Sequence, residues 1–191
     1  MSLVGLVSDV HGALSAAGLD HAFGGALALA YVADPRGTVD VDVNVFVSTE
    51  EVDTVLGALG ALGLQAERRR DQWLPLAGIR LRQAHGGYPV DLFLSLDERY
   101  GEIQRRCVSH PFGPDHIPLP FLSAEDLALF KLSFGRAKDW VDLRSIAFFR
   151  PGLDIDYIER QLVALRGSGM YPRVARLRNL LRGTHPRTGD T

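Results

Sequence analysis

The sequence predicts an α/β (α+β) fold in which a sheet flanked by helices is followed by a C-terminal helical region. The segment 38–47, TVDVDVNVFV, alternates apolar and polar side chains with the two-residue period of a β-strand. Helical and strand patterns then interchange up to about residue 121, and only helical patterns follow. We therefore expect a core over residues 1–121 and a helical region over residues 122–191.

The composition limits the kind of protein. A chain of 191 residues with 46% hydrophobic content can bury a core of its own. The single cysteine, Cys107, excludes an internal disulfide and a cysteine-based zinc cluster, so a metal would be bound by oxygen or histidine. The sequence has no apolar run of membrane-spanning length, and its start lacks the features of a secretory signal. We expect a cytoplasmic protein with no membrane partner.

The first half of the chain begins with a predicted helix over residues 4–19 and a short strand over 21–23. Gly24 and Gly25 then precede ALALAYV, an apolar segment with helical spacing that ends at the turn DPRG. The strand 38–47 follows, and the sequence STEE supplies the cap and acidic first turn of a helix that runs to about Leu62.

Strand patterns dominate after Gly63. They are LQAER, WLPLAGIRLRQ and YPVDLFLS, and the second and third pair as a hairpin around Gly86 and Gly87. The proline-containing stretch SHPFGPDHIPLPF is predicted to be a linker. Ser123 then caps a helix, and further helices follow in KDWVDLRSIAFF, IDYIERQLVALR and YPRVARLRNLLR.

Carboxylates interrupt two of these strands. Asp40 and Asp42 lie on one face of the strand 38–47, and Asp91 interrupts the apolar run YPVDLFL. Carboxylates that converge from adjacent strands form a hard oxygen site, which suits Mg²⁺ or Mn²⁺ and phosphate chemistry. The alternatives are a solvated strand face for Asp40 and Asp42 and a buried hydrogen bond for Asp91.

The paired glycines precede the acidic strand. At a helix start, free backbone amides and the positive end of the helix dipole can hold phosphate oxygens. A glycine pair alone is a common turn, so its value here comes from its order relative to the Asp-x-Asp strand.

In that order, FGGALALAYVADPRGTVDVDV resembles the signature of the polymerase-β-like nucleotidyltransferase superfamily, in particular its AbiEii and MenT toxin branch. Members have a Gly-Gly or Gly-Ser pair followed by Arg-x-Ser/Thr-x-Asp-x-Asp, which Arg36, Thr38, Asp40 and Asp42 match. The later segment LPFLSAEDLALFKLSFGRAKDWVDL also resembles this branch. It contains the residues Lys131, Arg136, Lys138, Asp139 and Asp142. The resemblance extends from about Phe23 to Leu143.

The resemblance implies a mixed sheet with helices and a metal-dependent transfer of nucleotides from NTP. Asp40, Asp42 and Asp91 would bind Mg²⁺ or Mn²⁺, while Gly24, Gly25, Arg36, Thr38 and Lys131 would bind the nucleotide. Catalysis would use Asp40, Asp42, Lys131 and Asp139, with Asp139 orienting Lys131 or the nucleotide. For Lys138 and Asp142 we expect an ordinary ion pair four residues apart on one helix.

A competing motif lies near the start of the chain. Asp9-Val10-His11-Gly12 resembles the first metal motif of calcineurin-like phosphoesterases, but the later Gly-Asn-His segment of those enzymes is absent. We expect Asp9 and His11 to mark a helix start or an exposed turn, and we expect His85, His110 and His116 to be surface residues.

The sequence leaves several acceptors of the nucleotide open. Residues 160–191 hold seven arginines and one acid, and Arg173, Arg176 and Arg182 surround a short helix that could bind RNA. The resemblance implies a toxin that modifies the 3′ end of tRNA and is restrained by a cognate antitoxin. The alternative for the helix is an ordinary solvated surface. The alternative acceptors are a protein hydroxyl and an aminoglycoside-like small molecule. The protein could also be an inactive binding module with this fold.

Overall fold

The structure is a computed structural model that describes residues 2–67 and 78–184. The chain forms two compact units. The first comprises Met1–Leu27 and Gly37–Leu122, and the second comprises Ala28–Arg36 and Ser123–Thr191. We describe each unit separately.

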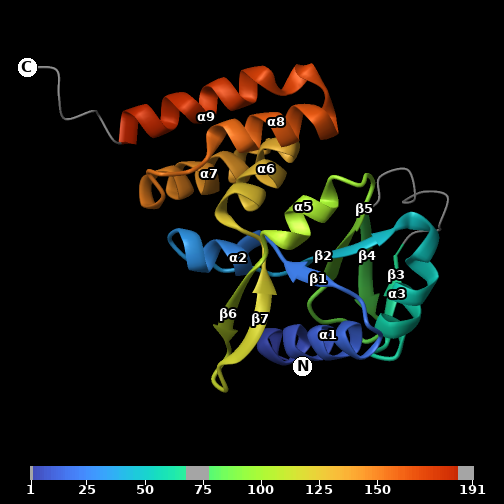
Figure 1. The fold of residues 1–191 in the computed structure, drawn as a ribbon. Helices are drawn as coiled ribbons and strands as arrows, with labels where there is room; N and C mark the ends of the chain where they lie inside the picture. The colour runs from blue at the N-terminus through green and yellow to red at the C-terminus, as the bar shows by residue number, and fades with distance from the viewer. Residues whose placement is uncertain (1, 68–77, 185–191) are drawn as a thin grey trace, which may run out of the picture. The chain divides into compact units, whose positions relative to one another are not determined.

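The first unit is built on a mixed seven-stranded sheet with the order β3-β4-β5-β2-β1-β7-β6 (Figure 1). The strands are β1 (His21–Phe23), β2 (Val41–Ser48), β3 (Leu64–Ala66), β4 (Gly78–Gln83), β5 (Val90–Ser95), β6 (Val108–Phe112) and β7 (Ile117–Phe121). The pairs β2–β5 and β1–β7 are parallel and the other pairs are antiparallel. The predicted sheet is therefore confirmed.

Helices accompany this sheet in the first unit. They are α1 (Leu3–Ala16), the start of α2 (Gly25–Val32), the 3-10 turn η1 (Thr49–Glu51), α3 (Val52–Gly60) and α5 (Tyr100–Arg105). Leu6, Val10 and Leu14 of α1 are buried at a spacing that places them on one face of the helix. α5 was not predicted, because its six residues are too few to give a clear helical period.

The central strand begins later than its sequence pattern suggests. β2 starts at Val41, and Val39 is 75% exposed, so the alternation over 38–47 includes a loop at its start. From Val41 onward the apolar positions Val41, Val43 and Val45 are buried, as a core strand requires.

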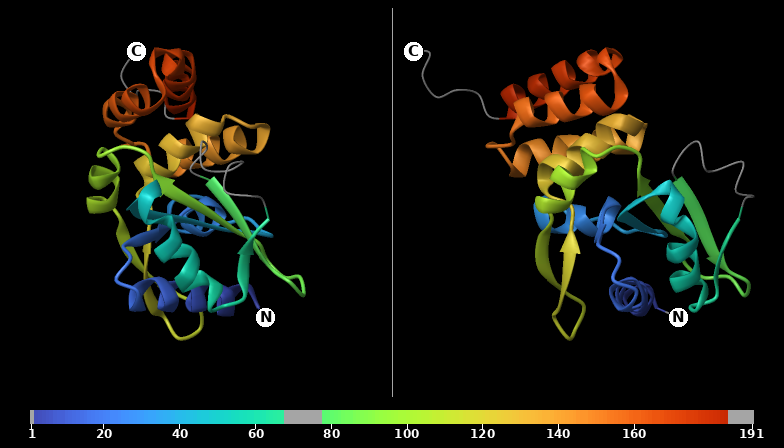
Figure 2. Two further views of the ribbon diagram at one scale, coloured as in Figure 1. Left: turned by 90° about the vertical axis from the view of Figure 1, so that its right-hand side faces the viewer. Right: turned by 45° about the vertical axis from the view of Figure 1, so that its right-hand side comes forward.

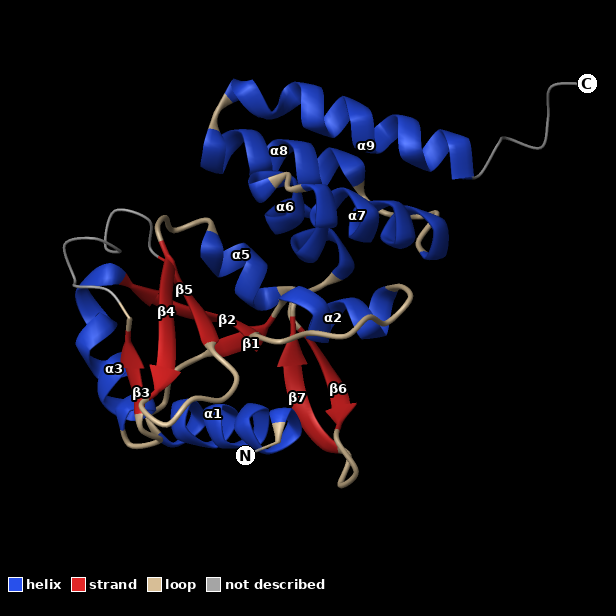
Figure 3. Cartoon of the chain, turned by 180° about the vertical axis from the view of Figure 1, so that it is seen from behind, coloured by secondary structure: helices blue, strands red, loops and turns tan. Residues whose placement is uncertain are grey.

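The segment predicted to be a linker is instead the antiparallel hairpin β6–β7, visible as a pair of red arrows in Figure 3. Its prolines argued against strands in the sequence analysis, because proline cannot donate a hydrogen bond within a sheet. Pro111 lies on the edge strand β6, and the pairing of β7 with β1 is confined to Phe121 and Phe23, so the prolines block few ladder bonds. Of WLPLAGIRLRQ, residues 73–77 lie outside the described residues and the remainder forms β4.

The second unit is helical, as predicted. It contains α6 (Ala124–Phe134), α7 (Ala137–Phe149), α8 (Ile155–Arg166), the 3-10 turn η3 (Ser168–Met170) and α9 (Tyr171–Thr184). α8 packs against both α6 and α9, and Figure 2 shows these helices side by side in two views. Ser123 caps α6 by accepting a hydrogen bond from the amide of Asp126 at 3.1 Å.

Residues 28–36 belong to this helical unit because α7 and the residue after it bind them. Arg150 donates hydrogen bonds to the backbone oxygens of Tyr31 and Val32, and the amide of Asp34 donates to the hydroxyl of Ser145 at 3.2 Å.

Candidate active site

Strand pairing brings two of the predicted metal ligands together. β2 and β5 run parallel, and Asp42 is in register with Asp91. Neighbouring strands lie about 4.8 Å apart, so these two carboxylates come from adjacent positions on one sheet face. The two acids predicted from separate segments of the sequence therefore belong to one place in the fold.

Asp40 lies just before β2 and is held by the threonine of the motif. The hydroxyl of Thr38 lies 2.6 Å from Oδ1 and 3.1 Å from the backbone oxygen of Asp40, so its single proton can be donated to either. Thr38 was predicted to bind the nucleotide, and its observed partner is Asp40.

The paired glycines lie against Asp42. The amide of Gly24 donates to the backbone oxygen of Asp42 at 2.9 Å. Gly25 has φ +53°, and a Cβ atom there would lie 1.7 Å from Oδ2 of Asp42. A side chain at this position would be strained and would also occupy the space of the carboxylate, so the second glycine is required for Asp42 to approach the start of α2.

Arg80 joins this group of acids, and sequence reasoning missed it. Its Nε lies 2.7 Å from Oδ1 of Asp91 and its Nη2 lies 2.5 Å from Oδ2, which is a bidentate pair. Nη2 also lies 3.6 Å from Oδ2 of Asp40. The hydrogen bonds to Asp91 raise the pKa of the Arg80 guanidinium above its ordinary value, so it stays charged.

The hairpin predicted from the sequence contained the signal for this arginine. Once β4 and β5 are paired around Gly86 and Gly87, Arg80 lies directly opposite Asp91. Opposite charges at facing positions of an antiparallel pair attract each other.

Asp40, Asp42 and Asp91 meet the requirements of a divalent metal site only in part. Within residues 2–67 and 78–184, no group of three or more histidine, cysteine, aspartate or glutamate side chains is arranged to hold a metal ion. Asp40 and Asp42 supply the hard oxygen atoms that Mg²⁺ and Mn²⁺ prefer, and the space that Gly25 leaves open admits the carboxylate of Asp42. Asp91, the third predicted ligand, is bound by Arg80.

A cavity of about 400 Å³ lies beside Asp40. Its lining is polar and aromatic as well as apolar and consists of Val39, Asp40, Arg80, Arg82, Gly87, Tyr88 and Pro89. The cavity therefore opens beside the carboxylate of Asp40 and the side chain of Arg80.

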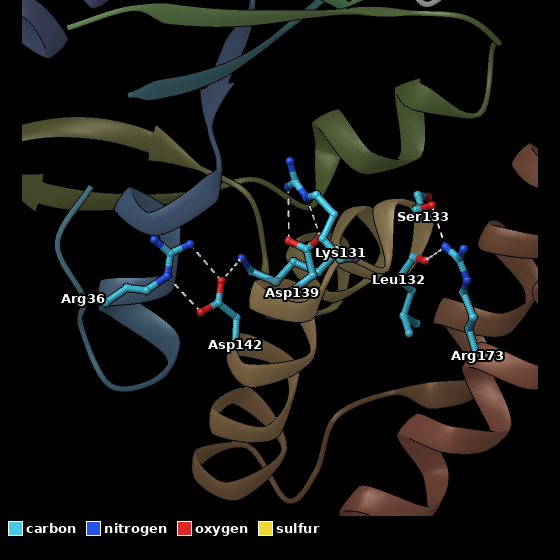
Figure 4. Close-up of polar contacts among 8 residues, drawn as sticks. Arg36, Lys131, Leu132, Ser133, Asp139, Asp142 and Arg173 are labelled. Atoms are coloured by element: carbon cyan, nitrogen blue, oxygen red, sulfur yellow. Dashed lines mark hydrogen bonds and ion pairs between the residues drawn. The ribbon is translucent and has the colours of Figure 1, made fainter. Parts of the chain in front are cut away.

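The second unit has a charged cluster centred on Asp142. Lys131 donates to Oδ2 of Asp142 at 2.5 Å, while Arg36 contacts Oδ1 through Nε and Oδ2 through Nη2, both at 2.9 Å (Figure 4). The side chains of Asp142 and Lys131 are only 3% and 6% exposed. Burial alone would raise the pKa of the Asp142 carboxyl, but the hydrogen bonds from Arg36 and Lys131 outweigh it and hold that pKa below its ordinary value.

This cluster corrects two details of the sequence analysis. Asp142 was expected to pair with Lys138, but Lys138 is exposed and Asp142 instead binds Lys131 and Arg36. The acid that contacts Lys131 is thus Asp142 rather than Asp139. The two cations of the separate motifs share one carboxylate, and that relationship could not be read from spacing along a single helix.

Asp139 has a different position. It is buried at the start of α7, where its Oδ2 accepts hydrogen bonds from the amide of Arg136 at 3.0 Å and from the Nε of Arg136 at 2.8 Å. A carboxylate at this position binds the N-cap amide and stabilises the first turn of the helix. Its catalytic role stays a prediction.

The arginines predicted to bind RNA differ in their surroundings. Arg173 donates to the backbone oxygens of Leu132 and Ser133 at 2.6 and 2.7 Å, so it caps the end of α6 (Figure 4). Arg176 stacks on the ring of Trp140 at 3.8 Å. Arg182 is exposed on α9.

The histidines do not form a phosphoesterase site. Asp9 and His11 lie inside α1, and Nδ1 of His11 is 2.9 Å from Nε2 of the buried His21. The expectation of a helix start or an exposed turn was therefore wrong. His85 and His116 are exposed and His110 is half-buried.

Comparisons with known proteins place the fold. No family profile and no curated protein sequence matches the chain. The solution structure of the antibiotic-resistance factor ANT(2'')-Ia matches with TM-score 0.53 and 18% identity over 94% of this chain and 91% of that chain. The crystal structure of ANT(2'')-Ia with adenylyl-2''-tobramycin matches with TM-score 0.53 and 16% identity over 94% and 98%.

A third solved structure is the lincosamide antibiotic adenylyltransferase LnuA with lincomycin bound, with TM-score 0.52 and 14% identity over 74% of this chain and 92% of that chain. The chain therefore has the nucleotidyltransferase fold, and the predicted fold class is confirmed. The narrower likeness to the AbiEii and MenT branch stays a prediction. In the part of the chain that the structure describes, no helix is long and apolar enough to cross a membrane.

Proposed function

We propose that this protein is a metal-dependent nucleotidyltransferase that transfers a nucleotidyl group from an NTP to an acceptor hydroxyl. The observation that supports it most directly is the carboxylate of Asp42 against Gly25, in register with Asp91, within a nucleotidyltransferase fold. This arrangement joins a helix start that can hold phosphate oxygens to carboxylates that can hold cations.

The reaction is a displacement at the α-phosphorus. The acceptor oxygen bonds to that phosphorus as the bond to the bridging oxygen breaks, pyrophosphate leaves, and the hydroxyl proton is released to water. Mg²⁺ or Mn²⁺ held by Asp40 and Asp42 would neutralise the charge that builds on the phosphate oxygens. Thr38 fixes Asp40 for that task, and Gly25 leaves the space that Asp42 needs.

The role of Lys131 rests on the sequence resemblance. The resemblance assigns it to neutralising the triphosphate, and its ammonium is bonded to Asp142. A lysine ammonium is a compact point charge, which suits a cation that neutralises a phosphate group.

For the acceptor we propose the 3′ end of tRNA, which makes the protein a toxin restrained by a cognate antitoxin. Support comes from the likeness of both sequence motifs to the toxin branch and from the arginine-rich C-terminal residues. A second candidate is a small molecule with a hydroxyl group. It is favoured by the structural likeness to ANT(2'')-Ia, which is described with adenylyl-2''-tobramycin, and to the lincosamide adenylyltransferase LnuA.

A labelling experiment separates these acceptors. The protein is incubated with each α-labelled NTP and Mg²⁺ or Mn²⁺, together with total tRNA, cell protein, or tobramycin and lincomycin in separate reactions. We expect label on tRNA that is lost with Asp42→Asn. Label confined to protein or to an antibiotic would refute the tRNA acceptor, and no transfer to any acceptor would refute the enzyme itself in favour of an inactive binding module.

The toxic effect has its own test. Expression of the protein without its antitoxin should stop growth, and Asp40→Ala should abolish that effect. If the Asp40→Ala variant is as toxic as the wild-type protein, nucleotidyl transfer is not the cause of toxicity.

A further inference from the structure

Arg80 lies among the acids to which the proposed function assigns the metal. Its guanidinium is paired with both oxygens of Asp91, at 2.7 and 2.5 Å, and its Nη2 lies 3.6 Å from Asp40. Asp91 is in turn in register with Asp42. The chain thus supplies a positive charge of its own to the carboxylates that a divalent cation would also need.

We propose that Arg80 is a resident counter-ion that competes with the divalent metal for Asp91 and Asp40, and that it must move aside when the metal binds. This inference rests on the proposed function, because it takes these carboxylates to be the metal site. It assigns a role to a residue outside both sequence motifs.

Two physical reasons support the competition. The fork of Arg80 takes one lone pair on each oxygen of Asp91, so while it stays a metal could bind only through the remaining lone pairs. A guanidinium that stayed within a few ångströms of the metal would also repel it, because two positive charges would share one small space.

The surroundings of Arg80 give its side chain a place to go. The side chain is 40% exposed, and it borders the 400 Å³ cavity beside Asp40. The neighbouring residues of β4, Ile79 and Leu81, are buried in the core and fix the backbone. The guanidinium can therefore turn into the cavity by side-chain rotation, while β4 keeps its place in the sheet.

β4 also offers a matched control. Arg82 is two residues further along, on the same face of the strand, and its side chain is 45% exposed. It too borders the cavity, but its partner is Glu67. Arg82→Gln therefore removes the same charge from the same strand and cavity without removing the contact with Asp91.

The test measures the binding of Mn²⁺ to the full-length protein by electron paramagnetic resonance, without nucleotide or acceptor. We expect Arg80→Gln to bind Mn²⁺ about tenfold more tightly than the wild-type protein, as the loss of a nearby positive charge implies. Arg82→Gln should stay within about twofold of wild type, since its charge is paired elsewhere. Equal affinities for wild type and Arg80→Gln, or an equal gain in both variants, would overturn the proposal.

Two further variants locate the bound ion. Asp91→Asn in the Arg80→Gln background should remove the gained affinity if Asp91 becomes a ligand once Arg80 is gone, and a retained gain would overturn the competition for Asp91.

Asp42→Asn separates this inference from the proposed function. If Asp42→Asn binds Mn²⁺ as tightly as wild type, the proposed metal site itself is wrong. If Asp42→Asn loses Mn²⁺ while Arg80→Gln changes nothing, only the role of Arg80 fails.

Discussion

The carboxylate of Asp42 lies so close to the backbone of Gly25 that only glycine fits there, because a Cβ atom at position 25 would lie 1.7 Å from Oδ2 of Asp42. The backbone adds to this requirement, since Gly25 has φ +53°. The second glycine of the motif is therefore needed to make room for the carboxylate of Asp42.

Gly25→Ala should abolish nucleotidyl transfer and lower the free energy of unfolding by about 1 to 3 kcal/mol, from backbone strain and steric overlap together. The measurements are label transfer from NTP and urea denaturation. Gly12→Ala is the control, because Gly12 lies in α1 and a Cβ atom there would have nothing within 4 Å, so alanine should be neutral or stabilising. Full activity in Gly25→Ala would contradict the proposed role of Asp42.

Replacing Asp142 should destabilise the protein strongly. Asp142→Asn would leave the buried ammonium of Lys131 without its carboxylate, and we expect a loss of about 3 kcal/mol in the free energy of unfolding. Lys138→Ala, an exposed change on the same helix, should stay within about 0.5 kcal/mol. Equal losses in the two variants by urea denaturation would restore the expected pair of Lys138 with Asp142.

The same carboxylate should make the protein sensitive to acid. The pKa of Asp142 is lowered in the folded protein, so the unfolded chain binds the proton more readily and the stabilisation is complete only above the ordinary value of 3.8. As the pH falls below that value and through the folded pKa, the stabilisation is lost. Urea midpoints measured from pH 7 downward should show this fall in the wild-type protein and a smaller one in Asp142→Asn. Parallel curves for the two proteins would show that other groups cause the acid sensitivity.

Strands could be predicted from the sequence where apolar residues and turn glycines mark them clearly. His21–Phe23 forms the predicted strand, and the turn at Gly86 and Gly87, both with positive φ, joins the predicted hairpin. The β6–β7 hairpin was missed because prolines at a sheet edge resemble those of a linker. Local backbone chemistry explains both outcomes, because paired glycines indicate a turn whereas prolines occur in linkers and in edge strands alike.

Several residues of the site could be predicted from the sequence, but the contacts between them could not. Asp40, Asp42 and Asp91 were identified because their carboxylates lie on strands with apolar neighbours, and the parallel register of β2 and β5 places Asp42 beside Asp91. Arg36 was missed as a partner of Asp142 because it lies 106 residues away in the chain. Contacts at such separations depend on how the elements pack, and no spacing along the sequence encodes them.

Arg173 and Arg182 give opposite predictions, although both were candidates for binding RNA. Arg173→Ala should lower the free energy of unfolding by about 1 to 2 kcal/mol, because it leaves the backbone oxygens of Leu132 and Ser133 without their donor. Arg182→Ala should leave stability unchanged, since Arg182 is exposed on α9.

The binding of tRNA then distinguishes a structural arginine from an RNA contact. If Arg182 contacts a phosphate, Arg182→Ala should weaken tRNA binding and reduce the slope of its salt dependence by about 1. The measurement is a filter-binding titration over a range of salt concentrations, with urea denaturation of the same samples. An unchanged salt slope in Arg182→Ala would exclude this end of α9 from the RNA interface. A reduced slope in Arg173→Ala at unchanged stability would instead show that its guanidinium faces RNA rather than the end of α6.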